Sequence, residues 1–411
     1  MDFDDTPEEA AFRAEARTWL EAHAPKKGSP EDFSTGYLEA TMTPEEFSRR
    51  VKNWLALLVD HGWAAITWPK KYGGRGGTAI QSTIWTQEAG QYGVTVNPFP
   101  VGIAMTGPTL MRHGTAEQKE RYLLPMLRGE EIWCQLFSEP DAGSDLANIS
   151  TRAVRDGDEW VVTGQKVWTS GAHEADWGIL LARTDPDVPK HKGITYFLID
   201  MRSPGIDIRP LKQMTGSEHF NEVFLDEVRI PHANVVGEPN GGWAATLTTL
   251  SNERGLIAGG NKSSDVVALI ELAKARGRSD DPVLRQMLID CWIRQQIQRY
   301  HGYRLQTALS KGVPPGPETS VMKLFATEYL RRLGKASLQM LGPEGQLLSD
   351  DSPAGTDWQA RFLFAPAIGI AGGSNEVQRN IMAERVLGLP KDIRTDRDVA
   401  FRDLSRGRAS Q

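Results

Sequence analysis

Residues 137–145 combine small residues and hydroxyls in a way that suits a polar ligand. They read Phe-Ser-Glu-Pro-Asp-Ala-Gly-Ser-Asp, with hydroxyls at Ser138 and Ser144 and a small residue at Gly143. Small residues let the backbone approach a ligand closely, and serine hydroxyls donate hydrogen bonds to carbonyl or phosphate oxygens. On their own, these residues fit a polar loop at the start of a strand equally well.

A second segment, residues 164–170, adds an aromatic side chain. It reads Gly-Gln-Lys-Val-Trp-Thr-Ser, so Trp168 stands beside the hydroxyls of Thr169 and Ser170. A lone tryptophan is usually a core residue. Beside two hydroxyls, a tryptophan favours a position against the face of an aromatic cofactor. Together the two segments predict a site for a flat, redox-active ring of the flavin type.

Other candidate ligand sites are weaker. The glycine-rich residues 72–77 lack the lysine and hydroxyl pair that follows in a phosphate-binding loop, so we favour an ordinary connection there. The two cysteines, Cys134 and Cys291, exclude a disulfide framework. No Cys/His cluster has metal-ligand spacing, and we therefore predict no metal site.

The composition is that of an ordinary soluble protein. The 411 residues suffice for two or three domains, and 40% of them are hydrophobic and 24% charged. A net charge of −6 argues against a nucleic-acid partner. No apolar run reaches the roughly 18 residues that cross a bilayer. The acidic start of the sequence does not resemble an export signal, and we expect a cytoplasmic protein.

Elements that would position the site follow a helical, β, then helical order. Capping boxes at Thr6-Pro7-Glu8-Glu9, Thr43-Pro44-Glu45-Glu46 and Thr115-Ala116-Glu117-Gln118 predict three helix starts. Behind the first two, apolar residues share one helix face: Phe12, Ala16, Trp19 and Leu20, then Phe47, Val51, Trp54, Leu55 and Leu58. The third helix should run toward Leu127. We expect a helical domain over residues 1–130.

From about Glu130 the pattern becomes that of strands. Asp156-Gly157 is a two-residue hairpin signal, and short runs at 178–182, 194–199 and 222–228 are rich in branched and aromatic residues. Residues 131–239 are therefore expected to form a β domain.

Helical periodicity returns after Gly242. We expect helices around Leu247–Ile257, at about Val283–Leu309 and Thr319–Leu341, and after Ser374, with a break at Pro314–Pro317. These would form a helical bundle over residues 240–390, and residues 391–411 a loose, charged tail.

Several motifs then occur in a fixed order along the chain. They are Gly62-Trp63, Trp68-Pro69, Tyr72-Gly73-Gly74, Gly114-Thr115, Gln118-Lys119, Ser138-Glu139-Pro140, Ala142-Gly143-Ser144-Asp145, Lys166-Val167-Trp168-Thr169-Ser170, Phe224 to Val228 with Pro231, Gln339 to Gly342, and Gly372 to Arg379. In this order they resemble the acyl-CoA dehydrogenase family, from about Glu8 to Pro390. The amino-acid sequence of these motifs is most similar to that of actinobacterial members of the family.

The resemblance implies a mainly α fold with a central β-barrel or sandwich domain and a C-terminal four-helix bundle. It implies FAD between the β domain and the bundle. Ser138 would bond the pyrimidine edge of the flavin, Trp168 would lie against the ring, and Ser170 would bond at N5. The remaining residues implied for FAD are Phe137, Gly143, Ser144, Thr169, Gln339, Gly342, Gly373, Ser374 and Asn375. Ser144, Arg254 and Gly372 would also contact the acyl-CoA.

The implied reaction needs a carboxylate base, and the family uses two positions for it. One lies two residues before Ser374, where this chain has Gly372. Isovaleryl and long-chain members instead take the base from a bundle helix, in a Leu-x-x-Glu-Arg pattern. Residues 250–254 of this chain, Leu-Ser-Asn-Glu-Arg, resemble that pattern. We therefore expect Glu253 to be the base; the alternatives are that Glu253 is a surface residue or that Glu376 takes part near FAD.

A second departure concerns FAD and the oligomer. Typical members carry Arg-x-x-Phe-Gly near residue 276, which grips the FAD pyrophosphate across a dimer. This chain has Arg276 and Arg278 but no Phe-Gly. Either arginine is a candidate replacement, and the assembly is expected to be a homodimer, a homotetramer or a mixed-subunit oligomer.

The resemblance thus implies FAD-dependent α,β-dehydrogenation of an acyl-CoA to trans-2-enoyl-CoA, with an electron-transfer flavoprotein as acceptor. Two alternatives stay open: a partner subunit of a heteromeric dehydrogenase, and a flavin oxidase or monooxygenase on the same fold. The acyl group is open as well, because spacing does not place the side chains that line a pocket. A base on the bundle helix suggests branched, long or sterol-derived chains.

Overall fold

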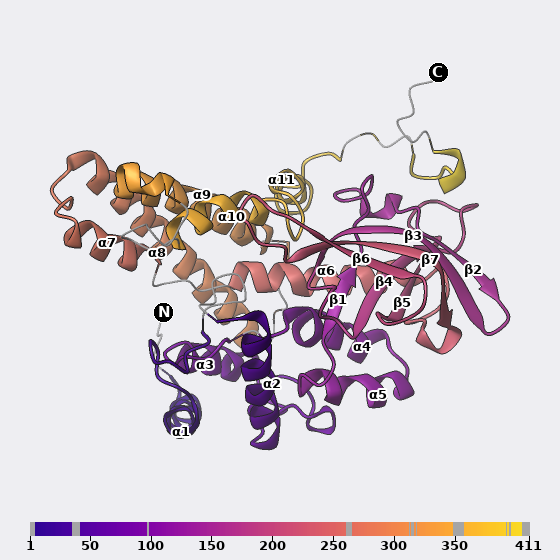
Figure 1. Cartoon of the computed structure of the whole chain (residues 1–411), viewed down its shortest axis with the longest axis horizontal. Coiled ribbons are helices and arrows are strands. Elements are labelled where there is room, and N and C mark those ends of the chain that lie inside the picture. The colour runs from indigo at the N-terminus through magenta and orange to yellow at the C-terminus, as the bar shows by residue number, and fades with distance from the viewer. Residues whose placement is uncertain are drawn as a thin grey trace. The chain divides into compact units, whose positions relative to one another are not determined.

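The computed structural model describes residues 5–34, 42–96, 98–259, 265–311, 313, 316–317, 319–347, 357–391, 393 and 396–404 (Figure 1). The chain divides into two compact units. The first comprises Met1–Gln213, Ser217–Asn252 and Ile393–Gln411, and the second comprises Met214–Gly216 and Glu253–Asp392. The division falls within helix α6 (Gly242–Gly259), just before Glu253.

The first unit begins with helices. They are α1 (Pro7–His23), α2 (Pro44–Asp60), η1 (Lys70–Tyr72), α3 (Ala79–Ala89), η2 (Val101–Thr106), α4 (Gly107–His113) and α5 (Ala116–Leu127). The sequence predicts the starts of three of them, α1, α2 and α5. Complete capping boxes form at the N-termini of α1, at Thr6, and of α5, at Thr115. At Thr43 only the hydroxyl bond forms, because Glu46 pairs with Arg49 and Arg50 instead of bonding back.

A seven-stranded sheet forms the rest of the first unit, with the order β1-β4-β2-β3-β7-β6 and β5 paired to β4. Its strands are β1 (Trp133–Leu136), β2 (Arg152–Asp156), β3 (Glu159–Ser170), β4 (Trp177–Arg183), β5 (Ile194–Asp200), β6 (Ile206–Leu211) and β7 (Phe220–Pro231). Short 3-10 turns η3 (Leu146–Asn148) and η4 (His232–Asn234) follow β1 and β7. The predicted central β domain is confirmed. Its strands β1 and β6 were not predicted from the sequence.

The hairpin between β2 and β3 corrects the prediction by one residue. Asp156 pairs with Glu159, so the two turn residues are Gly157 and Asp158 rather than Asp156 and Gly157. Gly157 has a φ of +59°, which glycine adopts without steric cost. The backbone therefore places the glycine first in the turn.

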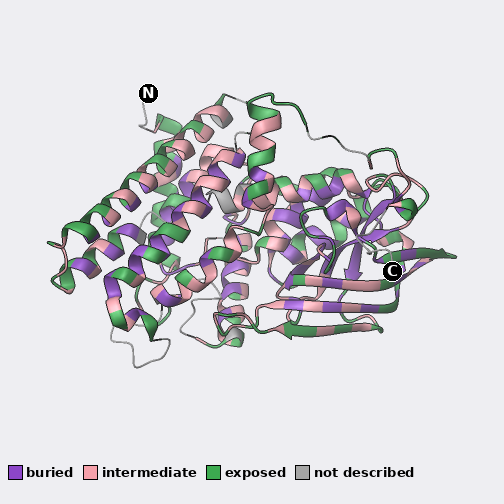
Figure 2. Ribbon diagram, turned by 90° about the horizontal axis from the view of Figure 1, so that it is seen from above, coloured by how far each residue is buried: buried purple, intermediate pink, exposed green. Residues whose placement is uncertain are grey.

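Strands β4 and β5 are buried on both faces. Ile179 and Leu181 join the core of the N-terminal helices, whereas Leu180 and Ala182 join the core on the other side of the sheet. This double burial explains their nearly continuous apolar runs. Figure 1 shows α4 and α5 alongside this part of the sheet. In Figure 2 buried and exposed segments alternate along several strands, and β3 has this alternation of burial.

The second unit is helical. Its elements are the end of α6, α7 (Asp265–Ala275), α8 (Pro282–Ser310), α9 (Thr319–Leu341), η5 (Gly342–Gln346), α10 (Asp357–Ile368), α11 (Asn375–Ile381) and η6 (Met382–Val386). The sequence predicts α6, α8, α9 and α11, but not α7 or α10. Apolar residues of α7, α8 and α9 share one core, which includes Leu269, Leu288 and Leu333. The predicted break at Pro314–Pro317 lies partly outside the described residues.

The C-terminal segment is not loose where the structure describes it. Phe401, in η7 (Phe401–Asp403), is 2% exposed, and the Arg183 guanidinium lies 3.8 Å from its ring centroid. The Phe401 amide donates to Val188 O, and a β-bridge joins Ala400 to Pro189. The prediction of a loose tail is wrong for 396–404, because one aromatic side chain anchors it; residues 405–411 lie outside the described part.

Candidate active site

A buried ion pair fixes the segment that carries Ser138. Lys166 Nζ on β3 donates to Glu139 Oε1 at 2.8 Å and to the carbonyl of Phe137 at 3.1 Å. Glu139 also accepts the amides of Ser150 and Thr151 at 2.6 and 2.9 Å. The Val167 amide donates to Ser138 O at 2.9 Å. Ser138 is thereby held against strand β3.

The charges of this pair are compensated within the protein. Burial alone would raise the pKa of Glu139, but the Lys166 ammonium and the surrounding donors outweigh burial and hold that pKa below its usual value. Burial lowers the pKa of Lys166, and Glu139 opposes that effect. An unpaired buried charge would be costly, so each partner requires the other.

The predicted residues around this pair differ in their access to a ligand. Phe137 is 3% exposed and packs edge-on against Tyr196, so its side chain belongs to the core. Ser138 is half-buried, whereas Gly143 and Ser144 are exposed. A Cβ on Gly143 would meet no atom within 4 Å, so its backbone faces open space. Ser138, Gly143 and Ser144 are therefore available to a ligand, and the Phe137 ring is not.

Trp168 is turned outward by a β-bulge. Lys166 pairs with Val223 and Thr169 with Asn221, so β3 has one residue more than β7 over this interval. Trp168 has a φ of +61° and is 61% exposed, with its ring edge-on to Phe220. A left-handed backbone at a bulky residue is strained and often marks a functional site. The indole is thus exposed to a ligand, and its contact with a flat ring stays a prediction.

The next residue faces the other way. Thr169 is fully buried, and its Oγ1 finds no partner among the described residues. Only its backbone can serve a ligand on the Trp168 side, which corrects the role expected for its hydroxyl. Ser170, one residue further on, is half-buried.

Asn221 supports this bulge and was not predicted. It is fully buried, and its Nδ2 donates to Thr169 O at 3.0 Å and His219 O at 3.2 Å. Burial and the neighbouring His173 lower the pKa of His219 to about 4. No sequence motif marks Asn221, because its role depends on the pairing of β3 with β7.

The candidate base lies in the second unit. Glu253 on α6 is half-buried and interacts electrostatically with Lys323 on α9 and with Arg254. Burial lowers the pKa of Arg254; Glu253 raises it and Arg385 lowers it. Glu376, the alternative, has a side chain 77% exposed, 3.3 Å from Arg379. The surroundings of Glu253 suit a functional carboxylate better than those of Glu376.

The loop at Gly372–Asn375 presents unpaired backbone donors. Gly372 and Gly373 have φ values of +64° and +88°. Gln378 Nε2 binds their carbonyls at 3.1 and 3.2 Å. The amides of Gly372, Gly373 and Ser374 donate to no other described residue. Ser374 caps α11 through a bond from the Val377 amide, while Asn375 is buried. We call these three amides the amide cradle.

The structure brings one of the two arginines to the other predicted FAD residues. Arg278 Nη1 donates to the carbonyls of Gln339 and Met340 at 3.1 and 2.8 Å, and lies near Gly342, whose φ is +63°. Arg276 pairs with Glu344 at 2.5 Å. Arg278, Gln339 and Gly342 thus form one group at the end of α9.

These residues fit FAD in their chemistry. The exposed indole of Trp168 suits a flat ring, and the backbone at Gly143 faces open space. The amide cradle and Arg278 are donors for phosphate or carbonyl oxygens. Among the described residues, no cluster of His, Cys, Asp or Glu could hold a metal ion.

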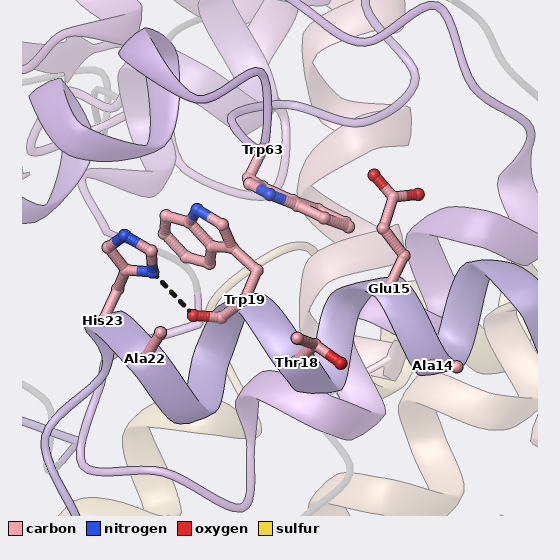
Figure 3. Close-up of a pocket in the computed structure, with 7 residues that line it drawn as sticks. All are labelled: Ala14, Glu15, Thr18, Trp19, Ala22, His23 and Trp63. Carbon is pink, nitrogen blue, oxygen red and sulfur yellow. Dashed lines mark hydrogen bonds between the residues drawn. The ribbon is translucent and has the colours of Figure 1, made fainter.

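A separate pocket lies on the surface of the N-terminal helices (Figure 3). It has a volume of about 510 Å³ and is lined by Ala14, Glu15, Thr18, Trp19, Ala22, His23 and Trp63. His23 Nδ1 lies 2.8 Å from Trp19 O. Beside the pocket, Arg75 pairs with Glu15 and stacks on Trp63. None of the residues that line this pocket is a predicted site residue. No helix of the described residues has the length and apolarity to span a membrane.

Family models match nearly the whole chain. The acyl-CoA dehydrogenase N-terminal domain matches residues 6–130, the middle domain 134–228 and the C-terminal domain 240–387. The three regions contain all the predicted site residues.

Known proteins agree with these matches. Acyl-CoA dehydrogenase IpdE1 of Mycolicibacterium smegmatis is 38% identical, with 93% of this chain and 98% of the relative covered. FadE34 of Mycobacterium tuberculosis is 41% identical over 88% of this chain, which spans 48% of that longer protein.

Two solved complexes have similar chains. The Tcur3481-Tcur3483 steroid ACAD has a TM-score of 0.80 and 30% identity, covering 95% of this chain and 100% of that one. The ChsE4-ChsE5 complex from Mycobacterium tuberculosis has a TM-score of 0.77 and 29% identity. The match covers 95% of this chain and 100% of that one. Fold, motifs and relatives agree on an FAD-dependent oxidoreductase that acts on acyl-CoA. The chain belongs to the acyl-CoA dehydrogenase family.

Proposed function

We propose that this chain converts an acyl-CoA thioester to its trans-2-enoyl-CoA, with Glu253 removing the α-proton. The observation that carries the proposal is the setting of Glu253: a half-buried carboxylate that interacts with two cations, Arg254 and Lys323. Nearby cations keep a carboxylate ionised and therefore able to accept a proton. The second position used in the family holds Gly372, which has no side chain to act as base.

The amide cradle supplies the other requirement of this chemistry. Removing the α-proton of a thioester places negative charge on its carbonyl oxygen, and fixed donors lower the energy of that charge. The three amides of the cradle donate to no other described residue and are therefore suited to this oxygen. Arg254 and Ser144 are our candidates for contacts to the CoA part of the substrate.

The proposed FAD contacts are of two kinds. Ser138, Ser144, Trp168 and Ser170, with the Gly143 backbone, suit the flavin, while Gln339, Gly342, Gly373, Ser374 and Asn375 suit the rest of the molecule. When bound, FAD accepts the β-hydrogen of the substrate as a hydride at N5. Arg278 lies beside Gln339 and Gly342 and replaces the missing Arg-x-x-Phe-Gly contact in this proposal. Arg276 is engaged by Glu344 and is the weaker candidate.

A bulky acyl group is the substrate class we propose. One similar complex is described as a steroid ACAD, and a base on the bundle helix is typical of members that take branched or long chains. A steroid-derived acyl-CoA should therefore be oxidised faster than butyryl-CoA. The electron acceptor in this proposal is an electron-transfer flavoprotein.

We also propose that α8 binds a second chain of the same fold. Its residues Leu284, Leu288 and Cys291 are buried in the bundle core. On the other side, Ile289, Trp292, Ile293, Ile297 and Tyr300 are 40–57% exposed. A helix with apolar residues on both faces is normally covered on both. We call these five residues the α8 face. One similar structure is the ChsE4-ChsE5 complex and another is named for two proteins, Tcur3481 and Tcur3483, which supports a sister chain as the occupant.

The proposed reaction is tested by anaerobic titration of the purified yellow protein with a panel of acyl-CoA thioesters. We expect bleaching of the flavin absorbance and an enoyl-CoA product, with bulky thioesters the most effective. Holoprotein that no thioester bleaches, alone or with its sister chain, would overturn the reaction. Rapid oxygen consumption by the reduced protein would instead favour a flavin oxidase.

A further inference from the structure

Lys323 is a fully buried lysine beside the proposed base and the amide cradle. It lies on α9 with an exposed fraction of 0%, and its Nζ donates to Gly373 O at 2.8 Å. A weaker contact joins Nζ to Asn375 Oδ1 at 3.4 Å. Burying an ammonium is costly unless it is bound, so these contacts define where the charge can lie.

The bond to Gly373 sets the direction in which this peptide points. Lys323 and Gln378 together hold the Gly373 carbonyl, and Gln378 holds that of Gly372. A peptide carbonyl and its amide point in opposite directions, since the unit is planar and trans. The Gly372 carbonyl shares its peptide unit with the Gly373 amide, and the Gly373 carbonyl shares its unit with the Ser374 amide. With the two carbonyls bound by α9 and α11, these two amides point to the opposite side and are left for a ligand.

Asn375 is held by the same helix. Thr327 Oγ1 donates to Asn375 Oδ1 at 2.8 Å, and Asn375 Nδ2 donates to Glu328 Oε1 at 3.2 Å. Lys323, Thr327 and Glu328 of α9 therefore hold Gly373 and Asn375 of the loop. Lys323 is the only charged donor among these three contacts.

The charges around Lys323 come from neighbouring helices. Glu253 on α6 and Glu376 on α11 both raise the pKa of Lys323, although burial, the larger effect, lowers it overall. Glu376 is exposed to solvent, which screens its charge, whereas Glu253 is half-buried. Arg379 pairs with Glu328 and Glu376, and Arg385 interacts with Arg254.

We propose that Lys323 is a positioning residue that holds the amide cradle in its donor-outward arrangement and keeps Glu253 ionised for proton removal. The inference rests on the proposed role of Glu253. It predicts that one buried ammonium links the two parts of the site that must act together: the donors for the thioester oxygen and the base for the α-proton.

The first test replaces Lys323 in the full-length holoprotein. Lys323→Met keeps a similar shape but removes the donor and the charge, and Lys323→Gln keeps a donor without the charge. Lys274→Met is the matched control, because Lys274 is exposed and its ion pair in the described part of the chain is with Glu271. Urea unfolding and circular dichroism establish that each variant is folded.

The kinetic readout is the pH dependence of kcat/KM. A missing cation raises the pKa of a nearby carboxylate, and the base must be ionised to act. Both Lys323 variants should therefore move the acid limb of the profile to higher pH. Lys323→Met should also lower kcat by about 10–100-fold, the loss expected for a misplaced oxyanion donor, with a smaller loss in Lys323→Gln. The Lys274→Met profile should match the wild type.

The second readout does not depend on catalysis. Hydrogen exchange in the peptide covering residues 369–378 should be faster in Lys323→Met than in the wild type, with and without FAD. An unchanged pH profile together with unchanged exchange would overturn the role of Lys323 while leaving the dehydrogenase reaction in place. If no acyl-CoA reduces the wild-type protein, the proposed reaction fails, and hydrogen exchange still decides whether Lys323 holds the loop.

Discussion

The ammonium of Lys166 lies 2.8 Å from a carboxylate oxygen of Glu139, and the two side chains are 0% and 5% exposed. One partner lies on β3 and the other beside Ser138, so the pair joins the two segments that the sequence assigns to flavin binding. Its geometry ties the stability of the β domain to the arrangement of the site.

Breaking this pair should be costly. Lys166→Met leaves the Glu139 carboxylate buried without its cation and should lower the free energy of unfolding by about 3–5 kcal/mol. Urea denaturation at neutral pH measures the loss. Lys166→Met combined with Glu139→Gln should be less destabilised than Lys166→Met alone, because no charge is then buried unpaired. A loss below about 1 kcal/mol for the single variant would contradict this account.

His219 should make the first unit less stable in acid. Its folded-state pKa is about 4, below the usual 6.5, because burial favours the neutral ring. The unfolded chain therefore binds more protons between these values, and the stability is complete above pH 6.5 and falls as the pH drops toward 4. The loss is up to about 3 kcal/mol.

The measurement is the free energy of unfolding from urea titrations across this pH range. His219→Gln should flatten the dependence between pH 6.5 and 4, whereas the pKa of Glu139, held below 4.5, affects stability only at lower pH. An equally steep dependence in the His219→Gln protein would show that another group is responsible.

Trp168 should matter for FAD and not for folding. Its ring is 61% exposed and its backbone has a φ of +61°, which glycine tolerates better. Trp168→Gly should therefore leave the free energy of unfolding unchanged or raise it by up to about 1 kcal/mol. The variant should bind FAD about 5–10-fold more weakly, since an aromatic contact is worth about 1 kcal/mol.

Flavin fluorescence titration of the apoprotein measures this affinity. Trp168→Phe is the control, because it keeps an aromatic face and should retain most of the binding. Wild-type FAD affinity in Trp168→Gly would remove the indole from the flavin site.

The α8 face should control assembly. Trp292→Glu with Ile293→Glu places two charges among exposed apolar residues and should separate the oligomer into single chains, as measured by light scattering. Val283→Glu is the control, because Val283 is 67% exposed but lies outside the α8 face. A double variant that keeps the wild-type mass, alone and with a sister chain, would place the interface elsewhere.

Local signals made much of the fold predictable. The capping boxes at Thr6 and Thr115 form as expected, and α9 has the predicted bounds, because these features depend on residues within a few positions of one another. Strand β6 was missed because its alternation of apolar and polar residues covers only Ile206–Arg209 and Pro210 interrupts it. The contact of Phe401 with Arg183 was missed because it joins residues far apart in the chain.

The motif residues of the candidate site were predictable from the sequence. The residues of other elements that hold these motif residues in place were not. Ser138, Trp168 and Glu253 stand out by residue type and neighbours, and the family matches include all three. Asn221 and Lys323 support them from other elements, and Lys323 is 50 residues from its partner Gly373. Such contacts arise from packing, so no local pattern predicts them. The outward turn of Trp168 depends in the same way on the pairing of β3 with β7.

Replacement of Glu253 by glutamine tests the proposed reaction most directly. The amide keeps the shape of the side chain but cannot accept the α-proton. We predict that Glu253→Gln binds FAD as the wild type does and is bleached by substrate about 10³-fold more slowly. Glu376→Gln, at the exposed alternative, should bleach at nearly the wild-type rate. Bleaching of Glu253→Gln at the wild-type rate would contradict the account.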